Sequence, residues 1–132
     1  MSVGYRPRAW GRVARAVAET LDDLRLALRT FAAERDWDQF HSPKNLASAL
    51  CVEASELLEV FQWLSEEQSK ALDPDARQRA SVELADVLLY LIRLADKLDV
   101  DLFAAARDKI ARNALRYPAD EVRGSARKMP LG

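Results

Sequence analysis

Two pairs of acidic residues are the part of this sequence best suited to chemistry: Glu53 with Glu56, and Glu83 with Asp86. The members of each pair lie three residues apart in a stretch of helical composition, so the spacing places both carboxylates on one helix face. If the two helices face each other, each pair of like charges costs roughly 4 kcal/mol at about 4 Å and an effective dielectric near 20. A divalent cation removes this repulsion, so the pattern predicts a metal site inside a helical bundle.

The surroundings of Glu53 favour a bound cation over a solvated face. Several apolar residues share its side of the helix: Leu46, Ala49, Leu57, Val60 and Leu64. A charge within an apolar stripe is costly unless it is compensated. The helix that carries the second acidic pair gives weaker evidence for a cation, because its polar stripe could also face water. That stripe consists of Glu83, Asp86, Tyr90 and Arg93.

The ligand types narrow the choice of metal. Sites built only from carboxylate oxygens suit Mg²⁺, with Mn²⁺ as the alternative, rather than Zn²⁺. A di-iron bundle needs Glu-x-x-His pairs, and the single histidine, His41, lies outside both helices. Residues 12–123 contain no glycine, which excludes the glycine-rich phosphate-binding loops there. If the chain handles phosphates, metal and side chains must hold them.

The composition limits which partners, cellular location and number of domains the protein can have. The chain has 132 residues, 49% of them hydrophobic, which suffices for one domain with a real core. A net charge of −1 argues against a nucleic-acid polymer or an anionic membrane as partner. No apolar run is long enough to span a bilayer, and no apolar signal segment follows the basic start, so we expect a cytoplasmic location. The single cysteine, Cys51, permits no internal disulfide.

The pattern predicts an all-α fold with four long helices, over about 20–34, 43–63, 74–98 and 102–116. Ser42-Pro43 and Asp73-Pro74 are typical N-cap and N1 pairs at two of the starts. A capping box at 65–68 predicts one further short turn. The expected organisation is a basic lead-in over 1–19, the domain over 20–118 and a polar tail over 119–132.

The third long helix is apolar around most of its circumference. Its apolar residues are Leu84, Val87, Leu88, Leu91, Ile92, Leu94, Ala95 and Leu98. One small domain can hardly cover that surface, so we expect a four-helix bundle that is completed by oligomerisation.

Two further groups of residues have two interpretations each. Trp37, in the connector 35–41, and Trp63 either fill the core or stack on a nucleobase. The basic side of the fourth helix either faces water or binds the phosphates of a substrate; it carries Lys109, Arg112, Asn113 and Arg116.

Three segments resemble the MazG-like all-α NTP pyrophosphohydrolases, most closely the short dCTP pyrophosphatase type, over about residues 20–128. They are FAAERDWDQFHSPKNLASALCVEASELLEVFQWLSEEQ, then ELADVLLYL, then DKIARNALRYPAD. The resemblance implies that Mg²⁺ is bound by four carboxylates, those of Glu53, Glu56, Glu83 and Asp86. Glu53 or Glu56 would then serve as the catalytic base.

The same resemblance implies the substrate contacts. Positions expected to hold the base and sugar are Trp37, Asp38, Gln39, Phe40, His41, Trp63 and Tyr90. Positions expected near the phosphates, donated across a subunit interface, are Lys109, Asn113 and Tyr117. Members of the family are dimers or tetramers.

The expected activity is Mg²⁺-dependent hydrolysis of a nucleoside triphosphate to the monophosphate and pyrophosphate. The resemblance favours dCTP-like pyrimidine deoxynucleotides and a role in clearing non-canonical or excess nucleotides. An all-α dUTPase-like or broader NTP pyrophosphatase is one alternative. A non-catalytic helical oligomer that binds nucleotide or metal is the other.

Overall fold

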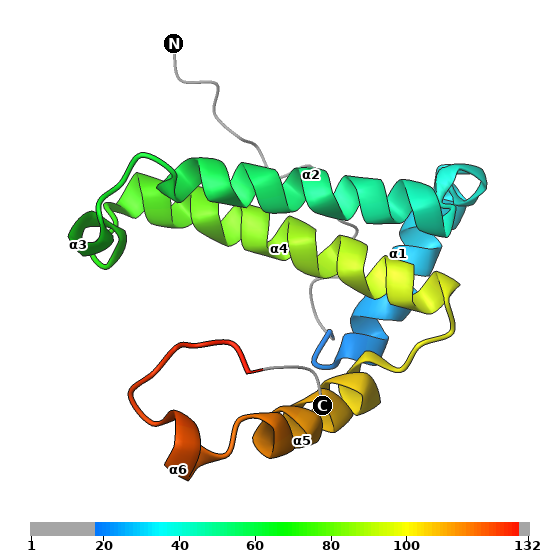
Figure 1. Ribbon diagram of the computed structural model, residues 1–132. Helices are drawn as coiled ribbons and strands as arrows, with labels where there is room; N and C mark the ends of the chain where they lie inside the picture. The colour runs from blue at the N-terminus through cyan, green and yellow to red at the C-terminus, as the bar shows by residue number, and fades with distance from the viewer. Residues whose placement is uncertain (1–17, 130–132) are drawn as a thin grey trace. The chain divides into compact units, whose positions relative to one another are not determined.

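The computed structural model describes residues 18–129, and all regular structure in this range is helical (Figure 1). The all-α prediction is therefore confirmed. The chain divides into two compact units, one up to Leu98 and one from Asp99 onward, and each is described by itself. Most of the predicted basic lead-in lies outside the described residues. None of the described helices is long and apolar enough to cross a membrane.

The first unit contains most of the helices. In chain order they are α1 (Leu21–Glu34), the 3₁₀ helix η1 (Asp38–Phe40), α2 (Pro43–Phe61), α3 (Glu66–Ser69) and α4 (Pro74–Lys97). Side chains cap their starts as the sequence predicts: Ser42 accepts a hydrogen bond from the Asn45 N–H, and Asp73 accepts one from the Ala76 N–H. A proline follows each of these two caps at the first helical position.

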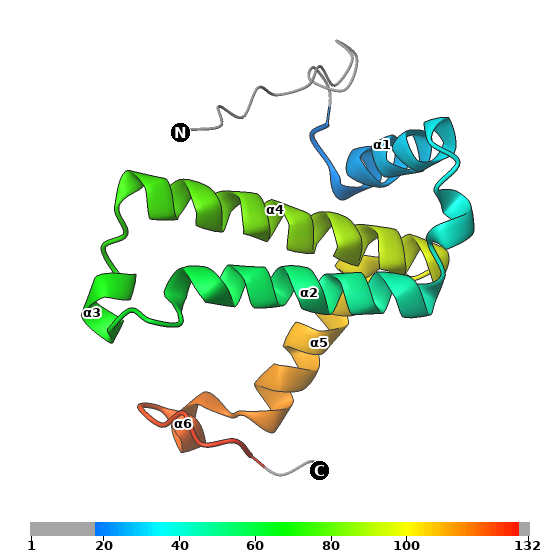
Figure 2. The same cartoon turned by 90° about the horizontal axis from the view of Figure 1, so that it is seen from above.

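Helices α2 and α4 run antiparallel and side by side, and both views show this pairing (Figures 1 and 2). Helix α1 contacts α4 as well. Buried alanines on these helices let the backbones approach closely, and Leu46 is the largest fully buried side chain in the described range. The buried apolar residues are Ala32, Leu46, Ala76, Ala80, Ile92 and Ala95. This pairing brings the two acidic motifs to one seam.

The second unit contains α5 (Leu102–Arg116) and the short α6 (Ala119–Val122). The sequence predicts α5 but not α6, which falls in the segment expected to be a polar tail. Arg116 also ties this segment back to α5, because its Nη2 atom donates to the Met129 carbonyl oxygen at 2.6 Å. Helix α2 ends at Phe61, two residues before the predicted end, so Trp63 lies beyond the helix.

Helices α2 and α4 leave several large apolar side chains exposed on the single chain. They are between 38% and 59% exposed: Val52, Leu58, Val82, Leu84, Leu88 and Leu91. An exposed apolar surface of this kind is typical of a protein that binds another chain.

Candidate active site

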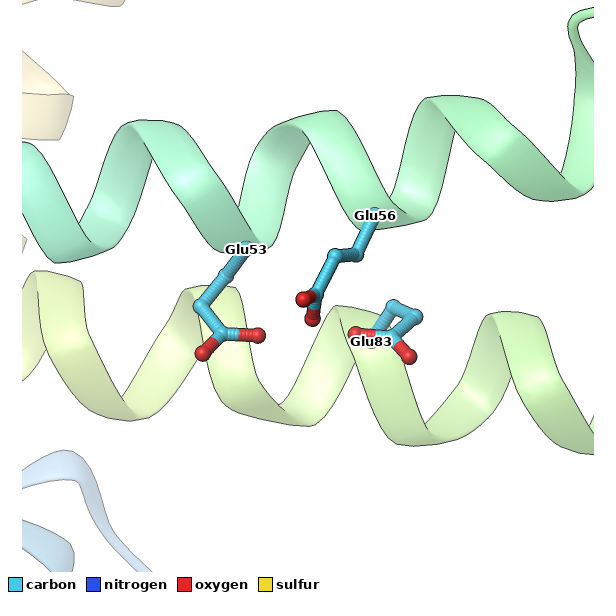
Figure 3. Close-up of side chains that lie close together, drawn as sticks. All are labelled: Glu53, Glu56 and Glu83. Atoms are coloured by element: carbon cyan, nitrogen blue, oxygen red, sulfur yellow. The ribbon is translucent and has the colours of Figure 1, made fainter.

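Three carboxylates converge between α2 and α4. Glu53 and Glu56 come from α2 and Glu83 from α4, and one oxygen of each lies within 4.8 Å of the others. Figure 3 shows the three side chains pointing toward one another across the seam. The fourth predicted ligand, Asp86, is not part of this three-residue group. It lies one turn along α4 from Glu83, and its charge acts on Glu53.

The pKa values of Glu53, Glu83 and Asp86 are all raised in this site. Burial raises the pKa of Glu53 to about 7, with further contributions from the hydrogen bond and charge of Glu56. Burial and the charge of Glu56 also raise the pKa of Glu83 and of Asp86. The pKa of the neighbouring Tyr90 rises through burial first and then through the charges of Glu53 and Asp86. These shifts define a site where negative charge is concentrated and poorly solvated.

One oxygen in the cluster has no hydrogen-bond partner. The Oε2 atom of Glu83 is buried, and it is the one such side-chain atom within residues 18–129. A buried acceptor left without a donor is costly, and a cation satisfies it. The ligand set offers only carboxylate oxygens, which suits a hard divalent ion. The residues present therefore fit a divalent metal.

Stability of the metal-free protein is expected to fall as pH rises. The pKa of Glu53 is higher in the folded state than its ordinary value of 4.5, so its contribution is fully present below about pH 4.5. That contribution disappears as pH rises through about 7. Between about pH 5.5 and about pH 8 we expect a loss of about 1–2 kcal/mol, after a discount for solvent screening. Thermal unfolding in EDTA at both pH values measures it.

Added metal should oppose this trend, because ligands must lose their protons to bind it. Saturating Mn²⁺ is expected to raise the melting temperature more at about pH 8 than at about pH 5.5. A Glu53→Gln variant lacks the titrating group and serves as the control. The assignment would be contradicted if, in EDTA, the wild type lost no more stability between the two pH values than Glu53→Gln does.

The connector between α1 and α2 presents aromatic rings to solvent. Trp37 is 45% exposed and Phe40 is 59% exposed. The Trp37 ring meets the Phe31 ring edge-on, with centroids 5.7 Å apart and planes at 72°. This contact holds Trp37 in place, and 45% of the residue stays exposed, as stacking on a base requires.

The polar residues of the connector are held by the fold. The Gln39 amide donates to the Asp36 carbonyl oxygen at 2.9 Å and to its carboxylate at 3.0 Å. Asp36 itself has a left-handed backbone, with φ of 53°. Asp38 accepts hydrogen bonds from Arg93 and Lys97 on α4. Both charges favour its ionised form, and the pKa of Asp38 is lowered, chiefly by the hydrogen bond from Lys97.

Four further residues are predicted to contact the substrate. Trp63 is 87% exposed just beyond the end of α2. Lys109 and Asn113 are exposed on α5, and Tyr117 is the C-cap of α5, with the Arg116 guanidinium 5.3 Å from its ring centroid. These three belong to the second unit, so their role at the phosphates stays a prediction.

Sequence reasoning missed the buried ionic contacts of α4. The sequence places Arg93 on a polar stripe with the predicted ligands Glu83 and Asp86, whereas the structure buries it and pairs it with Asp38 of the connector. Asp96 is also enclosed and accepts hydrogen bonds from Arg29 and Arg93. One feature of the sequence could have predicted the burial of Arg93: it lies between Ile92 and Leu94, in the most apolar part of the helix.

The protein is thus all-helical and has a cluster of carboxylates that fits a divalent cation. Residues 49–129 match the MazG-like family. The dCTP pyrophosphatase 1 of Homo sapiens is 45% identical over 127 residues, which span 95% of this chain and 75% of that protein. The dCTP pyrophosphatase 1 of Rattus norvegicus is 48% identical over 111 residues, which span 83% of this chain and 65% of that protein.

A crystal structure of a pyrophosphatase from Archaeoglobus fulgidus DSM 4304 has a similar fold. It superposes with a TM-score of 0.72 at 34% identity, over 77% of this chain and 95% of that chain. The chain belongs to the MazG-like family.

Proposed function

We propose that this protein is a Mg²⁺-dependent pyrophosphohydrolase that converts a nucleoside triphosphate and water to the monophosphate and pyrophosphate. Family membership and relatives named dCTP pyrophosphatase, at 45% identity over most of the chain, make it an enzyme of the nucleotide pyrophosphohydrolase class. The observation that carries the metal-dependent chemistry is the convergence of Glu53, Glu56 and Glu83 around a buried oxygen without a donor.

In the proposed reaction the acidic residues hold the metal and move a proton. Glu53, Glu56 and Glu83, with Asp86, would hold Mg²⁺. When bound, such an ion neutralises charge on phosphate oxygens and polarises water. Glu53 or Glu56, whose carboxylates face the centre of the cluster, accepts the proton of the water that attacks the α-phosphorus. The bond between the α-phosphorus and the oxygen that it shares with the β-phosphate then breaks, and pyrophosphate leaves with that oxygen.

The connector supplies nucleotide recognition in this proposal. The exposed rings of Trp37 and Phe40 offer stacking surfaces for a base, and Trp63 is a further candidate. The names of the relatives favour dCTP-like pyrimidine deoxynucleotides as substrates. Lys109, Asn113 and Tyr117 are proposed to bind the phosphates.

We further propose a homo-oligomer, a dimer or tetramer, in the cytoplasm. The exposed apolar side chains of α2 and α4 support the oligomer, because burial against a second copy removes them from water. A solution mass of one chain, measured by light scattering, would contradict it.

A panel of nucleoside triphosphates with Mg²⁺ tests the activity. We expect a monophosphate and pyrophosphate in equal amounts, resolved by chromatography, with dCTP among the best substrates. Strong preference for dUTP, or equal turnover of all bases, would assign the dUTPase-like or broad alternative instead. Release of orthophosphate, or nucleotide binding with Ca²⁺ but no turnover with Mg²⁺, would contradict the proposed reaction.

A further inference from the structure

Arg93 is buried on α4, with only 6% of its surface exposed. Its guanidinium extends from α4 to the connector that carries Trp37 and Phe40. The Nη2 atom donates to Asp38 Oδ1 at 2.6 Å, and Nε donates to His41 Nδ1 at 3.2 Å. The Nη1 atom donates to Asp96 Oδ2 at 3.4 Å. The three nitrogens thus serve three different partners.

This arrangement fixes the position of the connector. A buried guanidinium stays charged, so its carboxylate partners must remain in place. Asp38 begins η1 and His41 follows its last residue, so Arg93 holds both ends of this short helix. Asn45 on α2 adds a hydrogen bond of 3.0 Å from Nδ2 to the Phe40 carbonyl oxygen. The backbone beneath the aromatic rings is therefore fixed from two helices.

The same contact selects one form of the His41 imidazole. Because Arg93 can only donate, His41 Nδ1 must be unprotonated to accept its hydrogen bond. The neutral ring then carries its proton on Nε2, which becomes a hydrogen-bond donor. Burial and the charge of Arg93 lower the pKa of His41, which keeps the ring neutral at physiological pH.

We propose that Arg93 is a positioning residue, which holds η1 and the Nε2-protonated His41 in the arrangement that receives the nucleotide. This role rests on the proposed function, because it assigns the connector to nucleotide recognition. It differs from the role of the acidic cluster, since Arg93 acts on where the substrate sits and not on the metal. A connector fixed before binding loses less conformational entropy when the nucleotide binds.

The single histidine allows a direct test in tag-free protein. Nitrogen chemical shifts of the imidazole distinguish the two neutral tautomers without any substrate. In the wild type we expect Nδ1 unprotonated and Nε2 protonated. Arg93→Gln should give mixed tautomers, and Arg93→Lys should too, because a lysine has no planar fork to reach both partners. Arg79→Gln, an exposed arginine on the same helix, is the matched control and should leave the spectrum unchanged.

Steady-state kinetics tests the effect on substrate. Both Arg93 variants should raise KM for dCTP by roughly tenfold to a hundredfold and change kcat much less, because misplaced binding groups weaken the substrate complex. Arg93→Lys keeps the charge and guards against a variant that fails to fold. The affinity for Mn²⁺, measured by calorimetry without nucleotide, should match the wild type. An unchanged Mn²⁺ affinity would show that the substitution displaces the connector and leaves the acidic cluster intact.

Two results would overturn the role of Arg93: unchanged tautomers in a folded variant, or changed tautomers with an unchanged KM. Failure of the proposed function has a different signature, because the wild type itself would then turn over no nucleotide. In that case the nitrogen shifts would still decide whether Arg93 orients His41.

Discussion

Replacement of Glu56 by glutamine is expected to reduce nucleotide turnover by about a thousandfold or more while the protein stays folded. Glu56 lies at the centre of the acidic cluster, and its charge or hydrogen bond raises the pKa of Glu53, Glu83 and Asp86. Glutamine has the same shape but one fewer anionic ligand, so the variant should bind the metal weakly. Measurements of kcat and of Mn²⁺ affinity check both effects.

Glu59→Gln is the matched control, because Glu59 lies on the same helix outside the three-carboxylate group and the chemical change is identical. It should retain most of the activity. The metal-free Glu56→Gln protein should also be at least as stable as the wild type, since the substitution removes repulsion at a functional site. Near-normal turnover by Glu56→Gln would refute the ligand assignment.

Replacement of Asp96 by asparagine is expected to give the largest loss of stability, about 2–3 kcal/mol. The Asp96 side chain is 6% exposed and receives two hydrogen bonds from Arg29 on α1, at 2.6 and 2.7 Å. The pKa of Asp96 is lowered, first by the hydrogen bond from Arg29, so this contribution is present above about pH 4 and is lost in acid. Asparagine leaves the arginines without their counter-charge.

Chemical denaturation measures the loss, and hydrogen exchange should show faster opening of α1, which Asp96 links to α4. Asp75→Asn is the control on the same helix, where an exposed acid in the first turn contributes at most about 0.5 kcal/mol. A loss for Asp96→Asn no larger than that of the control would show that the buried contacts do not stabilise the fold.

Much of the fold could be predicted because local signals mark the helix boundaries. Ser42-Pro43 and Asp73-Pro74 place the starts of α2 and α4 at the observed residues. The end of α2 is harder to predict, because no glycine or proline stands directly after Phe61. The predicted helix was therefore two residues too long. Helix α6 has no side-chain cap and only four residues, so nothing in the sequence distinguishes it from a polar tail.

In the site, too, features set by neighbouring residues could be predicted, whereas contacts between residues far apart in the sequence could not. The i, i+3 spacing of Glu53 with Glu56 is a local pattern, and it led to the acidic cluster. The contact between Arg93 and Asp38 joins residues 55 positions apart, and no local pattern announces such a pair. Sequence reasoning therefore found the acids that need a cation but not the arginine that holds the connector.

Asp36 turns the chain into the connector with a left-handed backbone, although it is not glycine. Such a conformation strains an ordinary residue by about 1 kcal/mol or more. A glycine would relieve the strain but would also give the unfolded chain many more conformations to lose. Aspartate at this position restricts the conformations of the unfolded chain more than glycine would. It also provides two hydrogen-bond acceptors for Gln39. The loop that displays Trp37 and Phe40 is thus stiffened by its own sequence as well as by the helices around it.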